Sequence, residues 1–346
     1  MSLHQGFWEM TAVCNGNCKH CMYSSGYRDP KELDFVGKID VLKKFYELGI
    51  KNLVILGGEP TILPYSYEIF RVASEFPNVW VQTNGYVIEK EYFDFPFHWD
   101  FSLESANENE NDFIRGVGAF ERTVKNIYKA SIIWGKNITI RTTLTNKTNI
   151  SEMCELALRL RTNLLFMRFM PMGRGKSIEE LVPTTEKMVE AYLTVFDYFS
   201  AFKKINRKVE ILDPQFAFFT RWNAQYVKYF KNDKTACPAG RHRILVDHRG
   251  NYYPCNFFLK KLGNFLKDDI EKIKSKCQKF YEKWNEIGFE KSVENCPFRN
   301  VCSGGCKAMI YLTNKACYNC PVPIILEKHK DKVLKLTEFP IKLGGV

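Results

Sequence analysis

Helix-like segments alternate with short apolar runs through the first half of this 346-residue chain. Leu33, Leu42 and Phe45 recur at helical spacing, Gly49 follows where a carboxyl-terminal cap is expected, and the apolar run 53–56 comes next. The alternation continues for about 170 residues and implies a parallel sheet, but six units are too few to close the usual eight-unit barrel. We therefore expect an α/β fold, a partial (β/α)6 TIM-like barrel, whose functional loops gather at the carboxyl ends of its strands.

Three cysteines near the amino terminus have the spacing C-x3-C-x2-C: Cys14, Cys18 and Cys21, the N-terminal triad. Three thiolates so close in sequence can bind one iron–sulfur cube, whose four irons each take a ligand, so that one iron stays open to a small molecule. A structural zinc site is the alternative. Zinc normally takes four protein ligands, however, and no fourth cysteine or histidine follows at the usual finger spacing.

A glycine-rich turn, Gly57-Gly58-Glu59-Pro60, directly follows the apolar run 53–56. Glycine lets the backbone approach a ligand closely, Pro60 stops the strand, and the Glu59 carboxylate can accept a hydrogen bond from an ammonium group. Such a turn alone is typical of an ordinary strand-to-helix connection. Downstream of the triad and at the end of a strand, it indicates a ligand site.

Together, the triad and this turn resemble the radical S-adenosylmethionine (SAM) enzymes. The resemblance implies that the triad holds a catalytic [4Fe-4S] cluster and that residues 79–85, 101–105, 138–144 and 164–169 contain the third to sixth barrel strands. It implies the following SAM-binding residues: Gly57, Gly58, Glu59, Pro60, Thr83, Asn84, Ser102 and Arg141. Ser102 and Arg141 match positions that hold the ribose and carboxylate in relatives, although each is also compatible with a rim residue or a surface charge.

A second cysteine pattern lies beyond the helix-like stretch 184–204. It comprises Cys237, Cys255, Cys296, Cys302, Cys306, Cys317 and Cys320. This pattern resembles the SPASM, or twitch-type, extension of radical SAM enzymes, which holds two auxiliary [4Fe-4S] clusters. The resemblance implies a radical SAM barrel over residues 1–205 and a SPASM-like domain over residues 206–346, with a zinc-binding module as the alternative.

The resemblance also divides these ligands between two clusters. The first would be held by Cys237, Cys255 and Cys306, the C-terminal triad. The second would be held by Cys296, Cys302 and the last cysteine, Cys320; a further cysteine of the family pattern is replaced by Val293, and we expect Cys317 to supply that ligand. Cys277 could complete the first cluster, but it is more typical of a surface thiol.

Composition and charge limit the expected partners, location and cysteine chemistry of the protein. The formal charge of +11 permits nucleic-acid binding, but the basic residues are dispersed among acids and aromatics, as on a solvated helix face, so this partner is disfavoured. No stretch reaches about 18 apolar residues, and residues 1–10 carry no targeting signal, so we expect a cytoplasmic protein without a membrane span. In a reducing compartment, the twelve cysteines favour metal binding or catalysis over disulfides.

The family resemblance implies an enzyme that reductively cleaves SAM to a 5′-deoxyadenosyl radical and abstracts a hydrogen atom from its substrate. Relatives with this extension mostly modify ribosomally made peptides or proteins, so oxidative modification or cross-linking of a peptide is the leading expectation. The expected partners are ferredoxin or flavodoxin as reductant and, since the chain begins almost at the first strand, a separate peptide-recognition protein or direct docking. The alternatives are a small-molecule substrate, such as a haem or other tetrapyrrole precursor, and a non-catalytic iron–sulfur or zinc protein.

One substitution disfavours a particular activity. In sulfatase-maturing relatives, an aspartate that acts as a base directly follows the cysteine matching Cys255. Asn256 occupies that position and cannot usefully take a proton. A base, if one is needed, must therefore come from another part of the chain.

Overall fold

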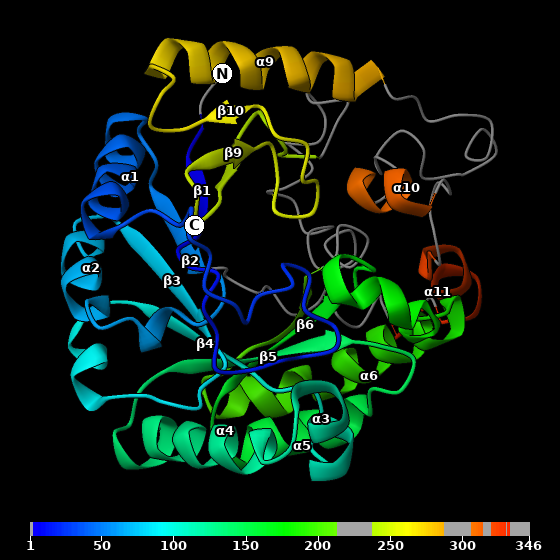
Figure 1. The fold of residues 1–346 in the computed structure, drawn as a ribbon. Coiled ribbons are helices and arrows are strands. Elements are labelled where there is room, and N and C mark those ends of the chain that lie inside the picture. Colours follow the sequence, from blue (N-terminus) through cyan, green and yellow to red (C-terminus); the bar gives the residue numbers. More distant parts are fainter. Residues whose placement is uncertain (1–2, 213–236, 287–305, 314–319, 330, 333–346) are drawn as a thin grey trace.

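The computed structural model describes residues 3–212, 237–286, 306–313, 320–329 and 331–332. Its strands form one ten-stranded sheet in the order β10-β9-β8-β1-β2-β3-β4-β5-β6-β7, curved so that helices cover the outside (Figure 1). The two ends of this order, β10 and β7, do not pair with each other, so the barrel is open. The expected α/β partial barrel is confirmed.

The strands β1 to β7 pair in parallel, each with the next along the chain. Their bounds are Gln5–Glu9, Asn52–Leu56, Asn78–Thr83, His98–Ser102, Ile138–Leu144, Asn163–Arg168 and Val209–Leu212. β8 (Arg243–Val246) pairs in parallel with the other side of β1, and β9 (Asn251–Tyr253) and β10 (Gly263–Asn264) continue antiparallel. One sheet therefore crosses the expected boundary after residue 205, and the two-domain division remains a prediction.

Helices connect the strands, and several of them begin at a residue whose side chain caps the first turn. They are α1 (Phe35–Glu47), α2 (Ser66–Ala73), α3 (Glu108–Arg115), α4 (Ala119–Tyr128), α5 (Ile150–Arg159) and α6 (Thr185–Lys204). The Asp34 carboxylate accepts a hydrogen bond from the Gly37 amide at 2.8 Å, and Asn107, Asn149 and Thr184 cap α3, α5 and α6 in the same way. α9 (Ile270–Glu286), α10 (Lys307–Thr313) and α11 (Val322–Lys328) follow the last strands. In the described residues, no helix is long and apolar enough to cross a membrane.

The fourth strand differs from its expected position at 101–105, because β4 ends at Ser102. Trp99 and Phe101 face the buried outer layer, while the alternate residues face the barrel interior. Leu103 still donates a hydrogen bond to Arg141, but Glu104 and Ser105 then turn away to bind α3. The polar residues after the strand thus hold the loop rather than continue the sheet.

The two faces of the sheet have different chemistry. Outward side chains pack with the helices into one large apolar core. A smaller group lines the interior, with Phe7, Val54, Leu56 and Leu245 at its centre. A third apolar group joins the end of β6 to α9 and α10 and contains all three cysteines of the C-terminal triad.

Candidate active site

The N-terminal triad lies on the loop after β1, at the carboxyl edge of the sheet, and its three side chains are half-buried. The Cys14 sulfur accepts a hydrogen bond from the Gly16 amide at 3.3 Å, and Asn84 Nδ2 lies 3.8 Å from it. Burial raises the pKa of Cys14 to about 11 and also raises that of Cys18. Bound cations would therefore be needed to keep these thiols ionised at neutral pH.

This donor set fits an iron–sulfur cube. Three thiols stand on one loop, and N–H groups point at a sulfur, an arrangement that stabilises cluster-bound thiolates. Among the described residues, no three histidine, cysteine or acidic side chains are close enough to share a single metal ion. A cube does not require that spacing, because each thiolate binds a different iron.

The glycine turn packs directly against the cysteine loop. The Gly58 amide donates to the Thr11 carbonyl at 2.6 Å, and the Glu59 amide donates to the Val13 carbonyl at 2.8 Å. A Cβ on Gly57 would lie 2.6 Å from the Thr11 oxygen, and one on Gly58 only 2.0 Å from the Val13 oxygen. These glycines are therefore required by the close approach of two loops, in addition to any approach of a ligand.

The Glu59 carboxylate, which we expect to accept a hydrogen bond from an ammonium group, is fully buried. One oxygen accepts hydrogen bonds from the hydroxyls of Thr61 and Thr83, both at 2.8 Å, and the other accepts from the Asn84 amide at 2.5 Å. Burial raises the pKa of Glu59 despite these bonds. Its side chain ties the turn after β2 to the end of β3, which leaves backbone groups of the turn to meet a ligand.

Glu104 is a residue that sequence reasoning missed. It is 3% exposed, and one carboxylate oxygen lies 2.8 Å from Arg115 Nη1 and 3.2 Å from His20 Nε2. Burial disfavours the carboxylate charge, but His20 and Arg115 outweigh it and hold the pKa of Glu104 well below its usual range. Because His20 lies between Cys18 and Cys21, this buried group fixes the cysteine loop to β4 and α3.

A second anchor comes from the 3-10 segment η4 (Gly173–Leu181) after β6. Arg174 donates from Nε to the Cys18 carbonyl at 2.8 Å and from Nη1 to the Ser25 carbonyl at 2.7 Å. Gly173 has φ +53°, and a Cβ there would lie 2.5 Å from the carbonyl oxygens of Cys21 and Met22. The Gly-Arg-Gly run at 173–175 is the only sign of this anchor in the sequence, and the sequence does not show that the run contacts the cysteine loop.

Ser102 and Arg141 occupy facing register positions on β4 and β5. Arg141 forms a 3.0 Å ion pair with Asp100 on the interior face of the sheet. Burial raises the pKa of Asp100, which Arg141 partly opposes. The structure thus brings these residues to the interior near the cysteine loop, and their contacts with SAM remain predictions.

The C-terminal triad converges although its members are far apart in sequence. Cys237, Cys255 and Cys306 all pack in the apolar group between β6, α9 and α10, and none is in a disulfide. Burial raises the pKa of Cys255 and Cys306, and each of these thiols is influenced by the others of the triad. This convergence fits an expected cluster that lies inside the protein.

The structure describes only some of the other cysteines that we expect to bind iron. Cys296, Cys302 and Cys317 lie outside the described residues, whereas Cys320 is half-buried against the main core. Cys277 is completely buried in that core, so its interpretation as a surface thiol was wrong. Its pKa is raised to about 12 by burial. It belongs to a different apolar group from the C-terminal triad.

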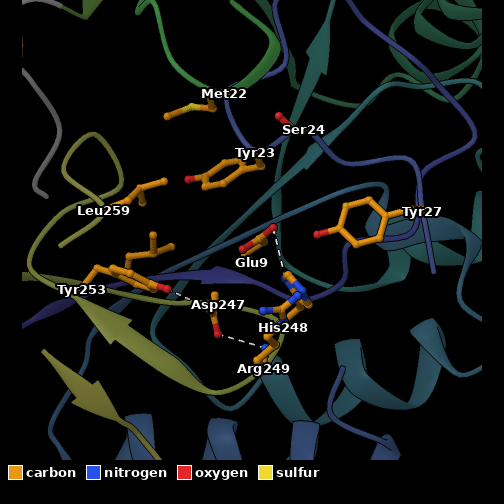
Figure 2. A pocket seen from close by; sticks show the side chains of 12 residues that line it. Glu9, Met22, Tyr23, Ser24, Tyr27, Asp247, His248, Arg249, Tyr253 and Leu259 are labelled. Carbon is orange, nitrogen blue, oxygen red and sulfur yellow. Dashed lines mark hydrogen bonds and ion pairs between the residues drawn. The ribbon is translucent and has the colours of Figure 1, made fainter. Parts of the chain in front are cut away.

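A cavity of about 320 Å³ opens at the seam where β8 meets β1 (Figure 2). Glu9, Tyr23, Tyr27 and Tyr253 surround it with polar groups, and Met22, Leu245 and Leu259 add apolar surface. The Tyr23 hydroxyl is buried and has no hydrogen-bond partner among the described residues. Burial raises the pKa of Tyr23. Met22, which also lines the cavity, directly follows Cys21 and packs against the apolar group of the C-terminal triad, so this wall of the cavity lies near both triads.

Behind the cavity, a row of charged groups runs from Glu9 toward the surface. His248 Nδ1 lies 3.3 Å from Glu9 Oε1, and His248 Nε2 lies 2.8 Å from Asp29 Oδ2, which also pairs with Arg249. Burial opposes the imidazolium, but the two carboxylates outweigh it and raise the pKa of His248 to about 9. Burial raises the pKa of Glu9 as well. Sequence reasoning missed this group, because its members are separated by most of the chain.

Comparisons with known sequences agree with this geometry. Residues 8–160 match the model of the Radical SAM superfamily. The chain is 28% identical over 340 residues to a mycofactocin maturase, MftC, of Mycobacterium tuberculosis, a match that covers 94% of this chain and 84% of that protein. It is 27% identical over 324 residues to an AdoMet-dependent heme synthase of Methanosarcina barkeri, covering 88% of this chain and 91% of that protein.

Solved structures share the fold. A structure of anSMEcpe with bound AdoMet matches with a TM-score of 0.71 at 15% identity, over 97% of this chain and 99% of that one. SuiB of Streptococcus suis bound to its precursor peptide SuiA matches with a TM-score of 0.69 at 16% identity, over 91% of this chain and 74% of that one. At these identities, the matches establish the fold alone.

Proposed function

We propose that this chain, whose residues 8–160 match the model of the Radical SAM superfamily, is a radical SAM enzyme that oxidatively modifies a ribosomally made peptide or protein. One side chain of that peptide would occupy the cavity at the β1–β8 seam. The observation that carries this proposal is the position of the cavity, with Met22 in its wall next to Cys21 and against the apolar group of the C-terminal triad. A substrate there would lie between the source of the radical and an auxiliary cluster.

The residues around the N-terminal triad would hold the cluster and SAM. When bound, that pair supplies the radical that removes a hydrogen atom from the substrate. The triad would bind three irons, and the backbone of Gly57, Gly58 and Pro60 would face the methionine part. Thr83 and Asn84 would hold the adjoining turn, and Ser102 and Arg141 would contact the rest of the nucleotide from the interior.

Glu9 is the proposed proton acceptor of the oxidation. This residue is 5% exposed and lines the cavity, and His248 holds its carboxylate in place from behind. The row Glu9, His248 and Asp29 leads from the cavity toward Arg249, whose side chain is 42% exposed. It offers a route for a proton to leave, and it places a base in the site where Asn256 cannot serve as one.

A Glu9→Gln variant tests this role. We expect formation of modified peptide to fall by about 100-fold, the usual contribution of a general base, because the amide cannot accept the proton. Cleavage of SAM to 5′-deoxyadenosine should continue, since Glu9 does not hold the cluster. Equal peptide modification by the variant and the unaltered protein would contradict the assignment.

The relatives support a peptide substrate, because MftC is named as a maturase and SuiB has been captured with a precursor peptide. The similarity to heme synthases favours a tetrapyrrole precursor as a second candidate. The cavity volume of about 320 Å³ is at the small end of ligand pockets, which run from about 300 to 1,000 Å³, and suits a single side chain better than a macrocycle.

We also propose the surrounding components. Two auxiliary clusters would bind to the C-terminal triad and to the set formed by Cys296, Cys302, Cys317 and Cys320. A ferredoxin or flavodoxin in the cytoplasm would supply electrons, and a separate recognition protein or direct docking would deliver the peptide.

The experiment is an anaerobic incubation of the reconstituted protein with SAM, a reductant and each peptide encoded beside its gene. One peptide should lose the mass of two hydrogen atoms, and the variant with alanine at all three N-terminal triad positions should leave every peptide unchanged. No mass change in any peptide, together with turnover of a tetrapyrrole precursor, would replace the peptide proposal by the second candidate.

A further inference from the structure

Two exposed lysines share one aromatic ring beside the N-terminal triad. Lys19 belongs to the cysteine loop, and its Nζ lies 3.5 Å from the centre of the Phe113 ring on α3. Lys147, in the turn after β5, has its Nζ 5.5 Å from the centre of the same ring. Within the described residues, neither lysine forms an ion pair with a carboxylate. Each ammonium group is attracted to the ring, but the two like charges repel each other, so an anionic partner would be favoured here.

The turn between α3 and α4 adds apolar surface and a third cation next to this ring. Phe113 is 52% exposed, and Val117 is 92% exposed. Arg122 on α4 donates from Nη2 to the Val117 carbonyl at 3.3 Å. We call Lys19, Phe113, Val117, Arg122 and Lys147 the Phe113 surface.

The carboxylates of the neighbouring helices do not neutralise these cations. Asp112 accepts hydrogen bonds from two backbone amides of the turn that follows α3, at 2.5 and 2.8 Å. Glu110 accepts one from a serine hydroxyl at 2.7 Å. Glu108 and Glu121 lie in the first turns of α3 and α4, and neither forms an ion pair with a cation of the Phe113 surface. In the part of the chain that the structure describes, the three positive charges of this surface are therefore uncompensated by ion pairs.

The Phe113 surface is connected directly to the triad. The Lys19 amide donates to the Ile114 carbonyl at 2.8 Å, which ties the cysteine loop to α3. The Cys18 sulfur lies 4.0 Å from the Arg115 carbonyl oxygen, and Arg115 is only two residues before the exposed Val117. A protein that covers Val117 would therefore lie close to a cluster ligand without entering the barrel.

We propose that the Phe113 surface binds the acidic face of the electron-carrier protein that reduces the N-terminal cluster. This inference rests on the proposed function, in which a ferredoxin or flavodoxin supplies electrons. One electron would leave the reduced carrier and enter the oxidised cluster, and no atom or proton would be transferred. Complexes of electron-transfer proteins often bury less than about 1,200 Å², and opposite charges speed their formation, so a few cations around a small apolar centre are sufficient. The surface shares no residue with the lining of the cavity at the β1–β8 seam, where the substrate would bind.

The test uses the anaerobically reconstituted full chain and a flavodoxin of net negative charge. Isothermal titration calorimetry measures the affinity of the two proteins, and rapid-freeze electron paramagnetic resonance measures the rate at which reduced flavodoxin reduces the N-terminal cluster. The variant with alanine at Cys14, Cys18 and Cys21 identifies the signal of that cluster by its loss, and the signal that remains is the auxiliary signal. The affinity should fall at least about tenfold between about 0.05 M and 0.5 M salt, because salt screens the opposite charges. An affinity that does not depend on salt would overturn the inference.

Charge-reversing variants locate the contact. Lys147→Glu and Val117→Glu should each lower the affinity for flavodoxin and the rate of cluster reduction by at least about tenfold. Reduction by titanium(III) citrate, a small reductant that needs no docking surface, should be unchanged in both. Lys51→Glu is the matched control, because it makes the same charge change at an exposed lysine just before β2, at the opposite edge of the sheet. It should leave both values nearly unaltered, and Lys147→Arg, which keeps the charge, should do the same.

The outcomes separate this inference from the proposed function. Equal losses in Lys147→Glu and Lys51→Glu would overturn the inference, because overall charge would then explain the binding. Weaker binding of the precursor peptide to Lys147→Glu, with unchanged flavodoxin binding, would assign the surface to the peptide and would also overturn it. Both results leave the enzyme assignment intact. If the unaltered protein reduced with titanium(III) citrate formed no 5′-deoxyadenosine, the proposed function would fail, whatever the flavodoxin measurements show.

Discussion

The two cysteine triads are built in opposite ways. The N-terminal triad lies within one short loop, and backbone hydrogen bonds, close-packed glycines and a buried charge group hold that loop against its neighbours. The C-terminal triad draws its cysteines from distant parts of the chain and packs them among aromatic and aliphatic side chains. The first arrangement therefore depends on hydrogen bonds within and between neighbouring loops, whereas the second depends on packing between segments that are far apart in the sequence.

The largest effect is expected from a substitution that breaks the contact between the glycine turn and the cysteine loop. Gly58→Ala would place a Cβ 2.0 Å from the Val13 carbonyl, so the two loops must separate. We expect a loss of about 3 kcal/mol in the free energy of unfolding. We also expect at least a tenfold loss of SAM cleavage, while the auxiliary signal is retained.

Gly49→Ala serves as the control for this substitution. Gly49 has a positive φ of +84°, which Gly58 does not, but nothing lies within 4 Å of an added Cβ at Gly49, so only the backbone cost of about 1 kcal/mol applies. Chemical denaturation and an assay for 5′-deoxyadenosine measure both variants. Equal losses in the two variants would mean that loop contact does not matter.

The next effect tests how much the buried ion pair of Glu104 and Arg115 stabilises the loop of the N-terminal triad. Glu104→Gln leaves the buried Arg115 without its partner charge, at a cost of about 3 kcal/mol in the free energy of unfolding. The folded-state pKa of Glu104 lies below its unfolded value of about 4.5, so this stabilisation is present above that pH and is lost as the pH falls through the folded pKa. Denaturation from pH 7 down to pH 3 should show the variant losing less stability than the unaltered protein, and parallel curves would contradict this.

A smaller effect on stability, with the opposite pH dependence, is expected at His248, which lines the cavity. Its pKa of about 9 exceeds the unfolded value of 6.5, so its stabilisation is complete below about pH 6.5 and disappears as the pH rises through 9. Glu9, Asp29 and Asp247 favour the charged ring, and Arg249 pairs with Asp29. A shift of this size corresponds to an upper limit of about 3 kcal/mol, because Asp29 also pairs with Arg249, whose side chain is 42% exposed. His248→Gln should flatten the stability curve between pH 6 and 10, and an unaltered slope would refute the charge assignment.

The smallest effect tests which cysteines bind iron. Cys277→Ala should lower the free energy of unfolding by about 1 kcal/mol, the cost of removing one buried atom, without changing iron content. Cys255→Ala is its counterpart and should release iron. Iron loss from the Cys277 variant, measured anaerobically, would show that Cys277 is an iron ligand.

Much of the fold and part of the site could be predicted from the sequence. The alternation of apolar runs and capped helices predicts the parallel barrel, and the C-x3-C-x2-C spacing with the glycine turn predicts that the cysteine loop and the turn form one site, because all these signals are local. Binding of SAM at that site remains a prediction. The end of β4 and the burial of Glu59 could not be predicted, since each depends on hydrogen bonds to partners in other loops. His248 likewise gains its importance from a residue far away in the sequence, Glu9.

The most direct measurement is 5′-deoxyadenosine formation by the anaerobically reduced protein and by its variant with alanine at Cys14, Cys18 and Cys21. The account predicts that the unaltered protein forms the nucleoside from SAM, and that the variant forms none while it keeps the auxiliary cluster signal. Continued formation by the variant, or none by the unaltered protein with its clusters intact, would contradict the central claim that the N-terminal triad is the site of radical generation.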